Sequence, residues 1–219
     1  MAAAPAPTPP RLLVLAAHPD PRLSRVNRRL TEAAIALQPA LGERLEVRDL
    51  YALYPDFALD AAAEQAAAAR ADLIVWQHPI HWYGMPPLMK LWLDEVFAFG
   101  WAYGPGGEAL RGKDLWLVAS TGGPEDSYHP QSYNRYFFDA FLPPYEQTAA
   151  LCGLRFLPPL VLHGAHAAPD AVIAGHAALF TQRLASYPDW PELATLADRE
   201  TCVAPDQDRP RNSEVGALS

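Results

Sequence analysis

The chain has 219 residues, of which 50% are hydrophobic and 19% are charged, and its formal net charge at pH 7 is −8. Its apolar runs are too short to span a membrane, no basic segment precedes an apolar stretch as in a secretory signal, and two cysteines make neither a disulfide framework nor a metal cage. Residues 187–219 hold three arginines against seven acidic residues, so the rest of the chain is only mildly acidic and a nucleic-acid partner is not expected.

The 23 prolines are unevenly spread along the chain. Four lie in residues 1–10 and four more in residues 187–219. Proline-rich, polar ends favour irregular structure. We therefore expect a disordered N-terminal tail over 1–10, one domain over 11–186, and an irregular acidic tail over 187–219.

Five short apolar runs have the length and composition of strands buried on both faces. In chain order they are Arg11–Ala17, Leu45–Val47, Leu73–Gln77, Leu115–Ser120 and Arg155–Leu162, the last interrupted by Pro158-Pro159.

Helical patterns separate these runs. The first begins near Ser24, a good N-cap residue, and is predicted to stop at Pro39 and Gly42. The others are Ala61–Arg70, Pro86–Val96, Tyr145–Cys152 and Pro169–Ala185, with a shorter piece at Tyr136–Phe141 and an irregular segment at Tyr51–Asp60. The alternation predicts an α/β fold with a five-stranded parallel sheet and helices on both faces. Five strands suit the flavodoxin-like order 2-1-3-4-5.

In such a sheet, ligands bind beyond the carboxyl ends of the strands, near the switch in strand order. The loops after strands one, three and four should therefore carry unusual residues. They are His18–Asn27, Pro79–Tyr83 and Thr121–Gly123.

The first of these loops leads into a predicted helix N-terminus, which favours a phosphate group. Ser24 and Asn27 offer side-chain donors, and positive charge comes from Arg22, Arg25, Arg28 and Arg29. The alternative is that Ser24 only caps the helix and the arginines are solvated. A G-x-G-x-x-G motif and a Walker loop are both absent, which weakens a direct NAD-type Rossmann site or an ATPase.

The other two loops offer aromatic and glycine residues. Trp82 and Tyr83 present flat surfaces that could stack beside a planar ligand, or they are ordinary core residues. Gly122 and Gly123 allow close approach of the backbone to a ligand, or they form a plain tight turn.

Several blocks of the chain resemble the flavodoxin-like NAD(P)H:quinone reductases. The segment ADLIVWQHPIHWYGMPPLMKLWLDEVF, which starts at Ala71, is similar to the strand–loop–helix signature of that family. Further matching blocks are AHPDP from Ala17, DLY and YPDF from Asp49, FGWAYG from Phe99 and STGG from Ser120. Together they cover about residues 11–185. YPDF, ADLIVWQHP and GWAYG bring the chain closest to the ancillary oxidoreductases of glutathione-gated potassium-efflux (Kef) systems.

The resemblance implies a flavin-dependent enzyme that passes two electrons from NAD(P)H to quinones or similar acceptors by ping-pong hydride transfer. It further implies a cytoplasmic homodimer with FMN as the leading cofactor, while FAD, and NADH against NADPH, stay open. An alternative is a regulatory ancillary subunit of a potassium–proton antiporter, peripheral at the inner face of the membrane, with redox activity secondary. A flavodoxin-type electron carrier is a third alternative.

The resemblance also assigns residues. The cofactor-binding set is His18, Ser24, Arg25, Val26, Asn27, Pro79, Ile80, His81, Trp82, Tyr83, Thr121, Gly122 and Gly123. His81 stands where the family often has Gln. Trp101 and Tyr103 resemble aromatics that line the substrate pocket of the neighbouring subunit. Tyr128 and His129 are hypothetical charge-relay donors, with a solvated loop as the alternative. The pairs His78/His81 and His163/His166 lack a third ligand at suitable spacing, so no metal is expected.

Overall fold

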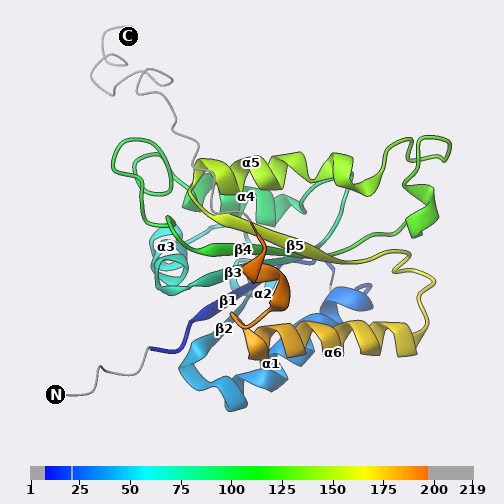
Figure 1. Cartoon of the computed structure of the whole chain (residues 1–219), viewed down its shortest axis with the longest axis horizontal. Coiled ribbons are helices and arrows are strands. Elements are labelled where there is room, and N and C mark those ends of the chain that lie inside the picture. Colours follow the sequence, from blue (N-terminus) through cyan, green and yellow to red (C-terminus); the bar gives the residue numbers. More distant parts are fainter. Residues whose placement is uncertain (1–7, 21, 197–219) are drawn as a thin grey trace, which may run out of the picture.

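The computed structural model describes residues 8–20 and 22–196, which form one parallel sheet covered by helices on both faces (Figure 1). The strands lie in the order β2-β1-β3-β4-β5, and every neighbouring pair is parallel. Their bounds are β1 Leu12–Ala16, β2 Leu45–Asp49, β3 Leu73–Pro79, β4 Asp114–Ser120 and β5 Arg155–Leu162. The predicted fold class and strand order are confirmed.

Six α-helices cover the two faces of the sheet. They are α1 Val26–Leu41, α2 Leu50–Leu53, α3 Ala61–Arg70, α4 Pro87–Val96, α5 Pro143–Leu151 and α6 Asp170–Ser186, with short 3₁₀ helices at Gly42–Arg44, Glu125–Ser127, Phe138–Phe141 and Pro191–Ala194. In Figure 1, α1 and α6 lie together below the sheet, and α4 and α5 lie above it. No helix in the described ranges has the length and apolarity needed to cross a bilayer.

The side chains of β1 alternate between the two faces of the sheet, which shows why these apolar runs form strands. Leu12 and Val14 belong to the core beneath α1 and α6, whereas Leu13 and Leu15 belong to the core beneath α3, α4 and α5. All four side chains are buried, because side chains of a strand alternate between faces and both faces are covered.

Helix α1 differs from its predicted end. Pro39 lies inside the helix, which continues to Leu41. Pro39 cannot donate to the carbonyl of Ile35, and its ring crowds that carbonyl, but α1 packs against α6 and continues through the proline. The chain leaves the helix at Gly42, whose positive φ of 59° glycine adopts without strain because it has no Cβ atom.

A buried carboxylate, that of Glu64 in α3, joins α3 and α4 to the edge strand β2. Glu64 of α3 is fully buried and accepts hydrogen bonds from Arg48, from the hydroxyl of Tyr54 (2.6 Å) and from Nε1 of Trp92 (2.7 Å). A buried carboxylate is tolerated only when it is paired and hydrogen-bonded in this way. The Tyr of YPDF and the Trp of the α4 signature therefore have structural roles behind the site.

The packed chain continues beyond residue 186, where we expected the domain to end. Tyr187 and Trp190 are buried in the core beneath α6. The Tyr187 hydroxyl donates to Asp114 at 2.9 Å, and the Trp190 ring contacts Trp116 edge-on with centroids 4.8 Å apart. Residues 1–7 and 197–219, which make up most of the two predicted tails, lie outside the described residues.

Candidate functional site

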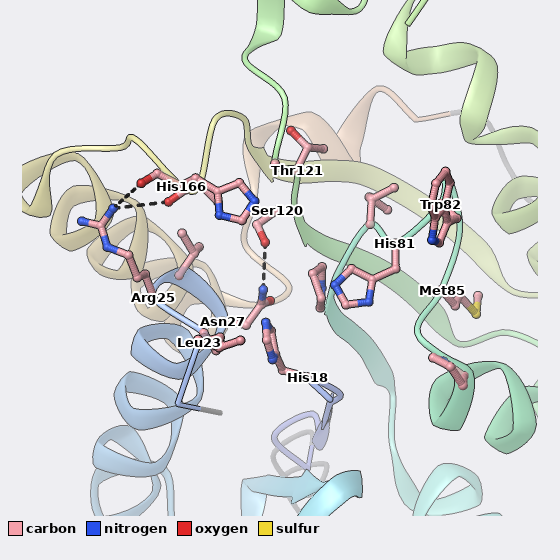
Figure 2. A pocket seen from close by; sticks show the side chains of 17 residues that line it. His18, Leu23, Arg25, Asn27, His81, Trp82, Met85, Ser120, Thr121 and His166 are labelled. Carbon is pink, nitrogen blue, oxygen red and sulfur yellow. Dashed lines mark hydrogen bonds between the residues drawn. The ribbon is translucent and has the colours of Figure 1, made fainter. Parts of the chain in front are cut away.

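A cavity of about 590 Å³ opens at the carboxyl edge of the sheet, between the loops that follow β1, β3, β4 and β5 (Figure 2). Eleven of the thirteen predicted cofactor-binding residues line it: His18, Ser24, Arg25, Val26, Asn27, Pro79, Ile80, His81, Trp82, Thr121 and Gly122. Tyr83 and Gly123 do not line the cavity. Its volume lies within the range of about 300–1,000 Å³ typical of small-molecule sites.

Six further residues line this cavity that the sequence analysis did not assign to the cofactor site: Leu23, Met85, Pro87, Ser120, Ala165 and His166. Ala165 and His166 belong to the loop after β5. Because β5 pairs with β4 at the same edge, the rule that pointed to the other three loops applies to this loop as well.

The start of α1 is fixed over the sheet by buried polar side chains. Ser24 Oγ accepts the backbone N–H of Arg28 at 2.9 Å, so Ser24 does cap the helix, although Arg25 is the boundary residue. Asn27 Nδ2 donates to Ser120 Oγ at 2.8 Å, and Gln77 Nε2 donates to the Asn27 carbonyl at 3.0 Å. These contacts hold the positive end of the α1 dipole at the cavity wall.

Arg25 has a different role from the one predicted. Its guanidinium donates to the carbonyls of His166 (3.0 Å) and Ala168 (2.9 Å) and to the carboxylate of Asp170 (2.8 Å), and Figure 2 shows the bond to His166. A fork of N–H donors suits two separate carbonyls in this way. Arg25 therefore fastens the loop after β5 to α1, and both of its terminal nitrogens are engaged there.

Backbone hydrogen bonds join the loop after β4 to the loop after β5. Thr121 N donates to the Leu162 carbonyl (3.0 Å), Gly164 N to the Gly123 carbonyl (2.8 Å) and Ala165 N to the Thr121 carbonyl (2.8 Å). Thr121 Oγ1 also lies 2.8 Å from the Gly123 carbonyl and 2.9 Å from His163 Nδ1. The loop at 121–123, of which Thr121 and Gly122 line the cavity, is thus held by the segment that follows β5.

The loop after β3 forms a strained turn. His81 and Gly84 exchange two backbone hydrogen bonds of 3.0 Å, and the residues between them, Trp82 and Tyr83, have φ values of 48° and 66°. Bulky residues in the left-handed region carry strain that is typical of functional sites. Tyr83 is held by Phe141, with stacked rings 4.9 Å apart, whereas the Trp82 side chain is 93% exposed at the cavity rim.

Two histidines meet edge-on in the cavity, His18 from the loop after β1 and His81 from the loop after β3, with ring centroids 6.0 Å apart (Figure 2). Burial lowers the pKa of both imidazoles, and the proximity of His81 lowers the pKa of His18 further. His18 Nδ1 accepts the backbone N–H of Asp20 at 3.1 Å, so the neutral ring carries its proton on Nε2.

The predicted charge-relay residues lie outside the cavity lining. Tyr128 is buried against Phe138, Phe141 and His163, and burial raises its phenol pKa. His129 is exposed, and its ring contacts that of Phe137. Within one copy of the chain, the structure does not bring this pair to the cavity.

The predicted substrate-pocket aromatics also lie elsewhere in a single copy. Tyr103 lines a second hollow with Phe99 and Cys152, and Trp101 packs against Phe97. Burial raises the pKa of the Cys152 thiol to about 12, so this cysteine is not reactive. Within the described ranges, no group of three or more His, Cys, Asp or Glu side chains is arranged to hold a metal ion.

Comparisons with known proteins agree with this architecture. Residues 10–184 match a family model described as having a flavodoxin-like fold. A crystal structure described as a thermophilic tryptophan halogenase (Th-Hal) from Streptomycin violaceusniger is 41% identical, with a TM-score of 0.72 over 78% of this chain and 97% of that one. General stress protein 14 from Treponema denticola, in complex with FMN, is 35% identical, with a TM-score of 0.71 over 80% and 97%. A putative quinone reductase from Klebsiella pneumoniae is 25% identical, with a TM-score of 0.70 over 83% and 86%.

Proposed function

Because the chain belongs to the family with the flavodoxin-like fold, we propose that it is a flavin-dependent oxidoreductase that passes two electrons from NAD(P)H to a quinone or a similar acceptor. The observation that carries the proposal is the cavity at the switch between β1 and β3, lined by the helix start and by the strained aromatic turn. The FMN complex of a 35% identical neighbour and the quinone reductase at 25% support this reading.

The residues present suit a phosphorylated flavin. The start of α1 offers backbone N–H groups for a phosphate, with the Nε2–H of His18 beside them, and the described residues that line the cavity include no Asp or Glu. The His166 ring lies against Gly122, where a Cβ atom would come within 2.9 Å of His166 Nε2. FMN is the cofactor we propose, and when bound it supplies the hydride chemistry that no protein side chain provides.

We assign the remaining roles to the chain itself. The loops at 79–83 and 121–123 would orient the ring system and exclude water from it, while the exposed Trp82 would flank the substrates. Since a single cavity serves both NAD(P)H and the acceptor, they would bind in turn, in a ping-pong order. Trp101 and Tyr103 would reach a cavity only from the partner of a homodimer, which is part of the proposal.

The direct test is oxidation of NADH and NADPH by the FMN-loaded protein with a benzoquinone as acceptor. We expect turnover with the quinone, parallel initial-rate lines as the quinone concentration is varied, and loss of turnover when FMN is removed. Failure to bind FMN, or to oxidise either nucleotide, would remove the proposal. Because one neighbour is described as a tryptophan halogenase, tryptophan and halide form a control reaction, in which we expect no halogenated product.

The alternative function, a regulatory ancillary subunit, requires a membrane-protein partner. Co-purification with a potassium–proton antiporter, or changed potassium efflux after deletion, would support it. Turnover with a quinone, together with unchanged potassium efflux after deletion, would support the oxidoreductase and exclude the ancillary subunit.

A further inference from the structure

A second, polar hollow adjoins the cavity, between α1 and α6, which lie side by side (Figure 1). Its volume is about 270 Å³, and we call it the arginine groove. Its described lining residues are Arg25, Arg28, Arg29, Glu32, Asp170 and Ile173. Arg25 also lines the cavity, so one side chain forms part of the wall of both. The groove and the cavity are therefore neighbours.

Two guanidinium groups of the groove have no hydrogen bond to the described part of the chain. The Arg28 side chain makes only an ion pair with Glu32, at 3.9 Å between exposed groups. The Arg29 side chain is exposed and makes neither an ion pair nor a hydrogen bond within residues 8–20 and 22–196. Arg25, by contrast, uses both terminal nitrogens to hold the loop after β5. The donors that a ligand could use in the groove therefore belong to Arg28 and Arg29.

The carboxylates of the groove do not cancel its positive charge. Three arginines line it against two acidic residues. Asp170 is paired with Arg25 at 2.8 Å, and Glu32 is paired with Arg28, which leaves the charge of Arg29 uncompensated among the described lining residues. In a chain whose net charge is −8, such a local excess of cations favours an anionic ligand over a neutral one.

The chemistry of two guanidinium groups indicates which anion fits. Arginine presents planar donors that match the oxygens of a phosphate. A phosphate monoester offers three such oxygens and carries close to two negative charges at pH 7. NADPH has a monoester of this kind on its adenosine ribose, where NADH has a hydroxyl group, and arginine is the usual protein partner of that phosphate.

We propose that the arginine groove binds the phosphate on the adenosine ribose of NADPH, so that the protein selects NADPH over NADH. The inference rests on the proposed function, which places the nicotinamide in the cavity. Arg28 and Arg29 hold the phosphate, and Arg25 forms the wall between the two ends of the coenzyme. The phosphate of FMN keeps its separate place at the start of α1.

Glu32 gives the proposal a sign that a purely structural role would not produce. Its carboxylate lies in the groove beside Arg28, where it repels a phosphate and competes for the guanidinium. Glu32→Gln should therefore strengthen binding of the phosphate, whereas Arg28→Gln and Arg29→Gln should weaken it. Damage to the packing of α1 would instead weaken binding in all three variants.

The experiment is a calorimetric titration of the full-length protein, with and without FMN, using NADP⁺ and NAD⁺ as probes. These two ligands differ only in the phosphate on the adenosine ribose, and neither can reduce FMN. The variants are Arg28→Gln, Arg29→Gln and Glu32→Gln, and the matched control is Arg111→Gln. Arg111 is exposed and paired with a nearby carboxylate, that of Glu108, as Arg28 is with Glu32, but it lines neither the groove nor the cavity.

We expect the wild type to bind NADP⁺ about tenfold more tightly than NAD⁺, and each arginine variant to lose about threefold of this ratio, since solvent screens exposed charges. Glu32→Gln should raise the ratio, Arg111→Gln should leave it unchanged, and added salt should reduce it. Equal affinities for NADP⁺ and NAD⁺, a ratio that neither arginine variant changes, or a ratio that falls in Glu32→Gln or Arg111→Gln would overturn the inference.

Turnover of the FMN-loaded protein with a benzoquinone separates this inference from the proposed function. Oxidation of NADH and NADPH with equal kcat/KM would overturn the assignment of the groove and leave the oxidoreductase intact. A protein that prefers NADP⁺ in calorimetry but oxidises neither nucleotide would contradict the proposed function and leave the phosphate site of the groove intact.

Discussion

Removing the Arg25 side chain should loosen the loop after β5 rather than delete a phosphate ligand. Its two carbonyl hydrogen bonds, at 2.9 and 3.0 Å, each contribute about 0.5–1.5 kcal/mol net. The ion pair adds little, because the Asp170 side chain is 96% exposed. Arg25→Ala should therefore lower the free energy of unfolding by about 1–3 kcal/mol, and the Tm by roughly 2–4 °C for each kcal/mol.

Arg25→Lys separates the two roles. An ammonium group retains the charge but cannot reach two separated carbonyls as a planar fork does, so its stability should stay near that of Arg25→Ala. Asp170→Asn is the matched control, and we expect its free energy of unfolding to stay within about 0.5 kcal/mol of the wild type.

Urea unfolding and FMN titration of the three variants show whether Arg25 fastens the loop or binds the phosphate. If Arg25 fastens the loop, Ala and Lys weaken FMN binding alike and in step with the loss of stability. The reasoning is refuted if Arg25→Lys keeps wild-type stability and FMN affinity while Arg25→Ala loses only the affinity, because a point charge would then suffice.

Three further predictions concern β3 and the loops that follow β3 and β4. Gly123→Ala should lower the free energy of unfolding, measured with urea, by about 1–3 kcal/mol, because the new Cβ would lie 2.7 Å from Ser127 Oγ, which is held in a hydrogen-bonded cluster. Gly122→Ala should lower it less, because its Cβ meets only the exposed ring of His166. Stability measured by urea should fall as the pH drops from about 6.5 toward 4, because the unfolded chain binds a proton that native His78, with its pKa of about 4, does not; His78→Gln should flatten this slope. Trp82→Gly should keep or raise the Tm, because glycine adopts the backbone φ of 48° without strain and the side chain that is lost is exposed. The same variant should lower quinone turnover. A lower Tm would contradict the assigned strain.

The sheet could be predicted from sequence because burial on both faces leaves a continuous apolar run, as in Leu73–Gln77. The position of the cavity followed from topology alone, since strand ends at one edge converge. Helix ends were harder to predict. Pro39 was expected to stop α1, but the packing of α1 against α6 outweighs the hydrogen bond that the proline removes.

Contacts between distant segments could not be predicted. Arg25 and Asp170 are 145 residues apart, and nothing in the local sequence distinguishes a phosphate ligand from a loop fastener. His166 was visible as half of an H-x-x-H pair, but its place beside Gly122 depends on the pairing of β4 with β5. The charge-relay hypothesis for Tyr128 rested on the family resemblance alone, and its burial against Phe138 and Phe141 is a tertiary property.

The central claim is that the cavity holds a flavin that exchanges electrons with NAD(P)H and a quinone. The most direct measurement follows the visible absorbance of the FMN-loaded protein under anaerobic conditions. We predict that NADH or NADPH bleaches the flavin band and that a subsequent addition of a benzoquinone restores it. A band that neither nucleotide bleaches, or a protein that takes up no FMN, would contradict the account.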